Sequence, residues 1–143
     1  SLCDLDAYKN EIDRLRNVYG EKIKIFFGIE FGFDERAENR YAELADKYKF
    51  DYVINSVHLV GGKDCCLNGC WENLSADDVY KEYLEKVYKS VNANYPWQIV
   101  GHLGYPVYKN RLGNHAYQND IHVKSLILQR RIPLSRAAYI LTY

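Results

Sequence analysis

The sequence predicts a single α/β domain with parallel strands and no membrane-spanning helix, and three observations lead to this prediction. Segments with a helical spacing of apolar residues alternate along the chain with short segments rich in β-branched and aromatic residues. The chain has 143 residues, of which 48% are hydrophobic, and this suits one domain with a core of its own. No stretch of about 18 apolar residues occurs, which excludes a membrane-spanning helix.

The first predicted helix covers residues 4–19, and Gly20 is placed to end it. Its apolar residues recur at helical spacing and are Leu5, Tyr8, Ile12, Leu15 and Tyr19. Residues 22–29 form a short β-branched and aromatic segment, which predicts a buried strand that ends at Glu30.

A second helix is predicted over residues 35–48, where one face carries Ala37, Tyr41, Leu44, Ala45 and Tyr48. Residues 51–57 predict a second strand, which ends at His58. A Gly-Gly pair then breaks the pattern, and we expect residues 62–74 to form a loop.

Ser75, followed by acidic residues, predicts the start of a third helix that runs to about residue 92. A third short strand is predicted over residues 98–101 and ends at His102. Residues 104–120 are rich in Gly, Pro, Asn and Tyr, and this composition predicts a loop.

Charge divides the chain into residues 1–120, one domain, and residues 121–143, a basic tail. The tail carries Lys124, Arg130, Arg131 and Arg136 but no Asp or Glu. The whole chain has 19 basic and 19 acidic residues, and its zero net charge argues against binding to nucleic acid or to an anionic membrane. The 14 Tyr residues fall mostly on apolar helix faces, so core packing explains them better than base stacking does.

The cysteines and the amino-terminal sequence predict a reduced, cytoplasmic protein. The chain starts without the basic and apolar segments of a signal peptide. Cys65, Cys66 and Cys70 form a cluster, but no second pair follows to complete a structural zinc site. We therefore expect these residues to lie in a loop with free thiols.

Three ionisable residues occupy the same position relative to the predicted strands. Glu30, His58 and His102 each stand just past the carboxyl end of a strand. In parallel α/β folds these ends meet at one edge, where ligands and catalytic groups gather. Two imidazoles and a carboxylate suit zinc, manganese or iron. The pattern predicts a shared metal or catalytic site, and structural histidines with a capping glutamate stay open as the alternative.

Other catalytic chemistries find less support in the sequence. It contains neither a Gly-rich phosphate loop with Lys-Ser/Thr nor a Gly-x-Ser-x-Gly turn. Cys65 or Cys66 could pair with His58 as nucleophile and base, but no third group is placed to orient the pair.

Three motifs carry a resemblance to a known family. The segments Phe-Phe-Gly-Ile-Glu30, Asp51-Tyr-Val-Ile-Asn-Ser-Val-His58 and Ile99-Val-Gly-His102-Leu follow one another in this order. Over roughly residues 3–117 the chain resembles the histidinol-phosphatase branch of the PHP (polymerase and histidinol phosphatase) superfamily. The resemblance implies a distorted (β/α)7 barrel with up to three metal ions at its C-terminal mouth. It also implies hydrolysis of histidinol phosphate to histidinol and phosphate, a step of histidine biosynthesis.

The resemblance also assigns roles to individual residues. Glu30 matches a carboxylate that bridges two metal ions, and His58 and His102 match imidazole ligands of one of them. Lys109 and Arg111 are the nearest loop cations that could hold the substrate phosphate. We therefore expect divalent ions (manganese, zinc or iron) as cofactors and a small-molecule phosphate ester as substrate.

The family's opening His-x-His motif does not occur in this sequence. We therefore expect the chain to represent the central part of a barrel, with weak binding of a single metal ion and little or no phosphatase activity of its own. Three alternatives stay open: a PHP phosphoesterase that acts on another phosphate ester or on a nucleic-acid end, a non-enzymatic remnant fold, and a tail that binds anions or nucleic acid.

Overall fold

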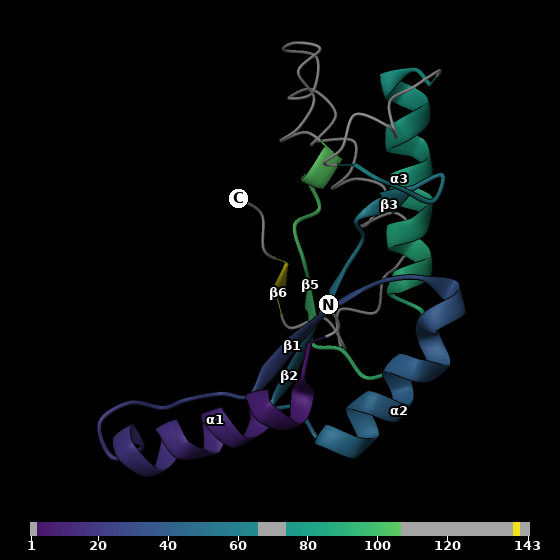
Figure 1. Ribbon diagram of the computed structural model, residues 1–143. Helices are drawn as coiled ribbons and strands as arrows, with labels where there is room; N and C mark the ends of the chain where they lie inside the picture. The colour runs from purple at the N-terminus through teal and green to yellow at the C-terminus, as the bar shows by residue number, and fades with distance from the viewer. Residues whose placement is uncertain (1–2, 66–73, 107–138, 141–143) are drawn as a thin grey trace.

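The computed structural model describes residues 3–65, 74–106 and 139–140 (Figure 1). The main sheet has the strand order β1-β2-β5-β6, and each neighbouring pair is parallel. Its strands are β1 (Gly28–Gly32), β2 (Tyr52–Ser56), β5 (Ile99–Val100) and β6 (Tyr139–Ile140). The predicted α/β class with parallel strands is therefore confirmed.

The first helix, α1, covers Leu5–Tyr19, as the apolar spacing predicts. Asp4 caps it by accepting a hydrogen bond from the Ala7 amide at 2.9 Å, and Gly20 follows its last residue. Figure 1 shows α1 at the lower left of the strands, while α2 and α3 lie to the right. No side chain of α1 is fully buried. The Tyr8 hydroxyl connects the helix to the sheet by donating a hydrogen bond to the Gly28 carbonyl at 3.0 Å.

The first strand begins later than the sequence predicts. Residues 22–27 are not strand, and Ile23 and Phe26 are 57% and 48% exposed. The partner strand β2 first pairs with β1 at Gly28, so the preceding residues have no neighbour with which to form a ladder. As a result Glu30 lies inside β1 instead of beyond its end, and this part of the prediction is wrong.

The segment after β1 follows the prediction more closely. A 3-10 turn, η1 (Glu35–Ala37), leads into α2 (Glu38–Tyr48) within the predicted range 35–48. The predicted second strand is present as β2. The expected loop from residue 62 is wrong at its start, because Leu59–Val60 (β3) and Lys63–Asp64 (β4) form an antiparallel hairpin.

The carboxyl-terminal half contributes α3 (Ala76–Ser90) and two strands. Ser75 caps α3 by accepting from the Asp78 amide at 3.2 Å, as predicted. Most of the predicted loop 104–120 and of the segment 121–143 lies outside the described residues, but β6 from that segment pairs with β5. Among the described helices, none combines the length and the apolar character that a bilayer crossing requires.

Aromatic side chains fill much of the core between the sheet and the helices. Phe31 on β1 stacks on Tyr41 of α2 with ring centroids 4.4 Å apart, and Tyr95 meets both rings edge-on. The buried tyrosines of the described chain are Tyr48, Tyr80, Tyr83 and Tyr95. They support the interpretation that tyrosines of this chain serve in core packing.

A buried amide fixes the central strand. Asn55 on β2 is 0% exposed, and its amide group donates to the Ser90 carbonyl at 2.7 Å. The Tyr95 hydroxyl donates to the Asn55 side-chain oxygen at 2.8 Å. Because Ser90 ends α3, one side chain ties the central strand to the end of that helix and to the loop that follows.

We expect Asn55→Ala to lower the free energy of unfolding by about 3 kcal/mol, because it leaves a buried carbonyl and a buried hydroxyl without their partners. Asn92→Ala is the matched control. Asn92 is exposed and its amide also donates to a helix carbonyl, that of Tyr88, so we expect a loss below about 0.5 kcal/mol. Urea unfolding of both variants checks this, and equal losses would contradict the role given to Asn55.

Candidate metal centre

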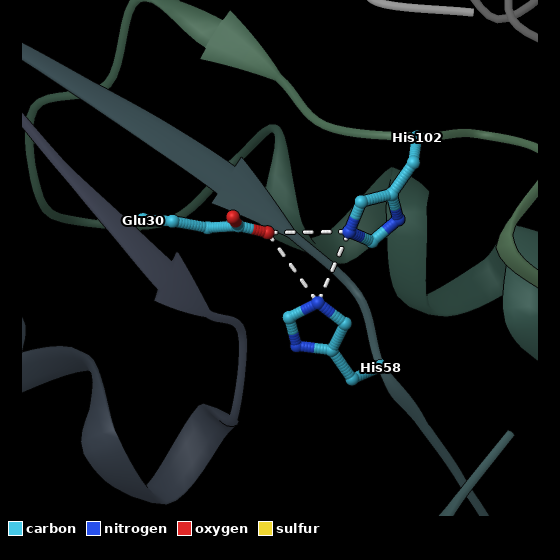
Figure 2. A group of neighbouring side chains, drawn as sticks. All are labelled: Glu30, His58 and His102. Atoms are coloured by element: carbon cyan, nitrogen blue, oxygen red, sulfur yellow. Dashed lines mark hydrogen bonds and ion pairs between the residues drawn. The ribbon is translucent and has the colours of Figure 1, made fainter. Parts of the chain in front are cut away.

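The structure brings Glu30, His58 and His102 together at one edge of the sheet (Figure 2). Glu30 lies in β1 opposite Ile54 of β2, His58 follows the end of β2, and His102 follows the end of β5. Since β1, β2 and β5 are parallel neighbours, their carboxyl ends point the same way. The geometric part of the prediction, that these three side chains share one edge, therefore agrees with the structure.

Three short distances define the cluster. The two Nε2 atoms of His58 and His102 are 3.0 Å apart, and Glu30 Oε1 lies 3.2 Å from His102 Nε2 and 3.4 Å from His58 Nε2. Ligand atoms bound at about 2.0–2.1 Å around a tetrahedral ion are separated by about 3.3 Å. The three donor atoms therefore have the spacing of one triangular face of a metal coordination sphere.

The protonation states suit such a site. Burial lowers the pKa of the His58 imidazole, and the neighbouring His102 lowers it further, against the opposing influence of Glu30 and Asp64. A neutral imidazole keeps a lone pair available for a metal ion. His58 is therefore ready to bind an ion near neutral pH.

The Glu30 carboxyl is ionised in this setting. Partial burial opposes its ionisation, but the nearby Ser56 hydroxyl, the hydrogen bond with His102 and the imidazole of His58 outweigh burial and lower its pKa. An anionic oxygen and two imidazole nitrogens form a donor set that zinc, manganese and iron accept.

Small residues make room around the cluster. A Cβ atom at Gly32 would lie 3.1 Å from His58 Nδ1, and a Cβ atom at Gly101 would lie 2.1 Å from Ser56 Oγ. Ser56 is 0% exposed, and its hydroxyl has no partner in hydrogen-bonding geometry within the described part of the chain. Sequence reasoning missed Ser56, although its position at the end of β2, two residues before His58, offered a signal.

Several candidates from the sequence are not placed. Lys109 and Arg111, the proposed phosphate contacts, and Cys66 and Cys70 of the cysteine cluster lie outside the described residues. Cys65 takes part in no disulfide, as expected, and is 0% exposed. A thiol shielded this fully from solvent gives no support to the nucleophile–base pair with His58.

Comparison with known proteins identifies the family to which this chain belongs. A sequence profile described as PHP domain matches residues 1–131. The chain belongs to the PHP domain family, as the resemblance of its motifs predicts. The match ends within the segment 121–143, and the division at residue 120 stays a prediction.

The similar proteins are histidinol-phosphatases. The chain is 26% identical over 104 residues to a probable histidinol-phosphatase of Clostridium acetobutylicum, a match that covers 73% of this chain and 39% of that protein. It is 32% identical over 92 residues to a histidinol-phosphatase of Lactococcus lactis, covering 64% of this chain and 30% of that protein. The chain therefore spans well under half the length of these curated relatives.

A solved structure shows the same fold. It is the histidinol phosphate phosphatase of Lactococcus lactis in complex with zinc, L-histidinol and phosphate, with a TM-score of 0.77 and 24% identity. The match covers 97% of this chain and 53% of that chain. The expected fold, part of a barrel of the PHP type, is confirmed.

The close approach of Gly101 to the Ser56 hydroxyl predicts that a side chain at residue 101 would destabilise the fold. We expect Gly101→Ala to lower the free energy of unfolding by about 1–3 kcal/mol, because the added methyl group collides with the Ser56 hydroxyl. The double variant Ser56→Ala/Gly101→Ala should recover at least about half of this loss, since it removes the closest contact. Urea unfolding measures both, and an equal loss in the double variant would contradict this packing.

Proposed function

We propose that Glu30, His58 and His102 bind a divalent metal ion in a phosphatase centre. The protein to which this chain corresponds would hydrolyse histidinol phosphate to histidinol and phosphate. The observation that carries the proposal is the triangle of donor atoms at separations of 3.0, 3.2 and 3.4 Å at the carboxyl edge of a parallel sheet. The similarity to histidinol-phosphatases, one of them solved with zinc, histidinol and phosphate, supports the choice of ion and substrate.

The chain's own residues would contribute charge and orientation. A bound divalent ion supplies Lewis acidity toward phosphate oxygens and lowers the pKa of a bound water. The Glu30 carboxylate offsets part of the ion's charge, and its contact with His102 fixes which of its oxygens faces the centre. An imidazole that binds a metal ion adds no charge, so a divalent ion held by Glu30, His58 and His102 would keep a net positive charge that favours a phosphate dianion.

The proposed phosphate contacts lie outside the described residues. Lys109 and Arg111 are our proposed partners for the substrate phosphate, because they are the first cations after His102 in the sequence. A phosphate ester other than histidinol phosphate stays the second candidate function within the same chemistry. Because the chain spans 39% and 30% of the two relatives, we expect metal binding to persist in it while turnover is low or absent.

We expect the metal-free chain to bind Zn²⁺ or Mn²⁺, and Glu30→Gln, His58→Ala and His102→Ala each to weaken binding on the order of 100-fold, because each removes one of three ligands. Isothermal titration calorimetry measures the affinity. Glu21→Gln is the matched control for Glu30→Gln, since Glu21 is exposed on the loop after α1. Unchanged affinity in all three site variants would show that the two histidines are structural.

Substrate choice is tested with the zinc-loaded chain. We expect it to bind histidinol phosphate more tightly than a nucleoside monophosphate, with phosphate release slow or absent, and we expect Glu30→Gln to abolish the binding. Calorimetry and a phosphate-release assay measure the two quantities. A preference for the nucleotide would favour the second candidate function, and rapid release that is lost in Glu30→Gln would show the expectation of low turnover to be wrong.

A further inference from the structure

An aromatic ring lies against both imidazoles of the candidate metal centre. The Tyr105 ring centroid is 4.9 Å from that of His58, in an edge-on arrangement, and 4.6 Å from that of His102, at an interplanar angle of 30°. The two imidazoles are themselves 4.9 Å apart. One ring thus contacts the only two histidines of the described chain, which are the two proposed nitrogen ligands.

Tyr105 is held at both of its ends. Its backbone N–H donates to the His102 carbonyl at 2.9 Å, and its hydroxyl donates to Asp64 Oδ1 at 3.3 Å. Asp64 lies in β4, the second strand of the hairpin that begins directly after His58. The Tyr105–Asp64 contact therefore joins the segment that follows β5 to the segment that follows β2.

The hairpin is in turn tied to His58. The Cys65 amide donates to the His58 carbonyl at 2.9 Å, and Leu59 pairs with Asp64 across the two short strands. On the other side, the Tyr83 hydroxyl of α3 donates to the His102 carbonyl at 3.0 Å. Hydrogen bonds thus hold the backbone of both histidines. These bonds do not restrict the rotation of each imidazole about its side-chain bonds.

That rotation is usually fixed by a hydrogen bond from the imidazole nitrogen that does not bind the metal. His102 Nδ1 is buried and has no such partner among the described residues, while its Nε2 faces Glu30 and His58 (Figure 2). A ring packed against the imidazole restricts the same rotation by steric contact. Tyr105 is placed to do this for His102 and, edge-on, for His58.

We propose that Tyr105, held in place by Asp64, is a positioning residue that keeps both imidazoles in the orientation needed to bind one metal ion. This inference rests on the metal site proposed above. Its physical basis is preorganisation: side chains already restricted in the free protein lose less conformational entropy when the ion binds. The proposal also gives the short hairpin a role, because its residue Asp64 accepts the hydrogen bond from the Tyr105 hydroxyl.

The test compares variants that remove the ring or only its anchor. We expect Tyr105→Ala to weaken Zn²⁺ binding by about 10–100-fold, and Tyr105→Phe and Asp64→Ala each to weaken it by a smaller factor of about 3–10. Asp64→Asn keeps a side-chain oxygen that accepts from the hydroxyl, so it should bind within about twofold of the unchanged chain. Tyr88→Ala removes a tyrosine that is 41% exposed on α3 and is the matched control, with a change of about twofold at most.

A second readout separates positioning from a general loss of structure. Bound Co²⁺ absorbs light according to the geometry of its ligands, so Tyr105→Ala should alter the visible spectrum of the cobalt-loaded chain, whereas Tyr88→Ala should not. Unfolding in the presence of a chelator shows whether each variant folds. If Tyr105→Ala does not fold, Tyr105→Phe and Asp64→Ala carry the comparison.

The outcomes distinguish this inference from the proposed function. If the unchanged chain binds zinc and Tyr105→Ala binds it equally well with the same cobalt spectrum, the positioning role is wrong and the metal site stands. If Asp64→Asn weakens binding as much as Asp64→Ala, Asp64 acts through its charge and the anchoring role is wrong. If the unchanged chain binds neither zinc nor cobalt, the metal site itself is wrong and this inference fails with it.

Discussion

The parallel pairing of β2 with β1 on one side and β5 on the other is the constraint on which the candidate centre depends. Successive residues of a strand point to opposite faces, so a shift of one residue in the β1–β2 register would carry Glu30 to the other face of the sheet. The buried hydrogen bonds of Asn55 resist such a shift, because they hold the middle strand to the end of α3. The triangle of donor atoms is thus a consequence of strand register as much as of residue type.

The sequence predicted that Glu30, His58 and His102 lie together better than it predicted their local structure. His58 and His102 follow short segments whose composition marks them as strands, and the rule that parallel strands end at one edge placed them together. Glu30 was predicted just past a strand and lies within one, because Gly28 is the first residue of β1 that finds a partner on β2. Pairing with a distant segment decides where a strand begins, and the local sequence does not contain that information.

The features missed in the sequence are those that depend on contacts between segments. The hairpin that contains Asp64 turns at Gly61 and Gly62, which have φ of 58° and 76°. A Gly-Gly pair between two short strands is a recognised hairpin signal, so it predicts more here than the end of a strand. The need for glycine at residue 101 has no local signal at all. It arises because the Ser56 hydroxyl of the neighbouring strand occupies the space that a Cβ atom would fill.

In the proposed centre, two kinds of contact would orient the metal ligands. The Glu30 carboxylate faces its neighbours through polar contacts, with an oxygen 3.2 Å from His102 Nε2. The ring of Tyr105 packs against both imidazoles. Ring packing restricts rotation without taking a proton or a lone pair from either imidazole, whereas a hydrogen bond selects one tautomer. In the proposed site, orientation by packing would leave both nitrogen donors available to the ion, and the affinity would then depend on the shape of residue 105 more than on its charge.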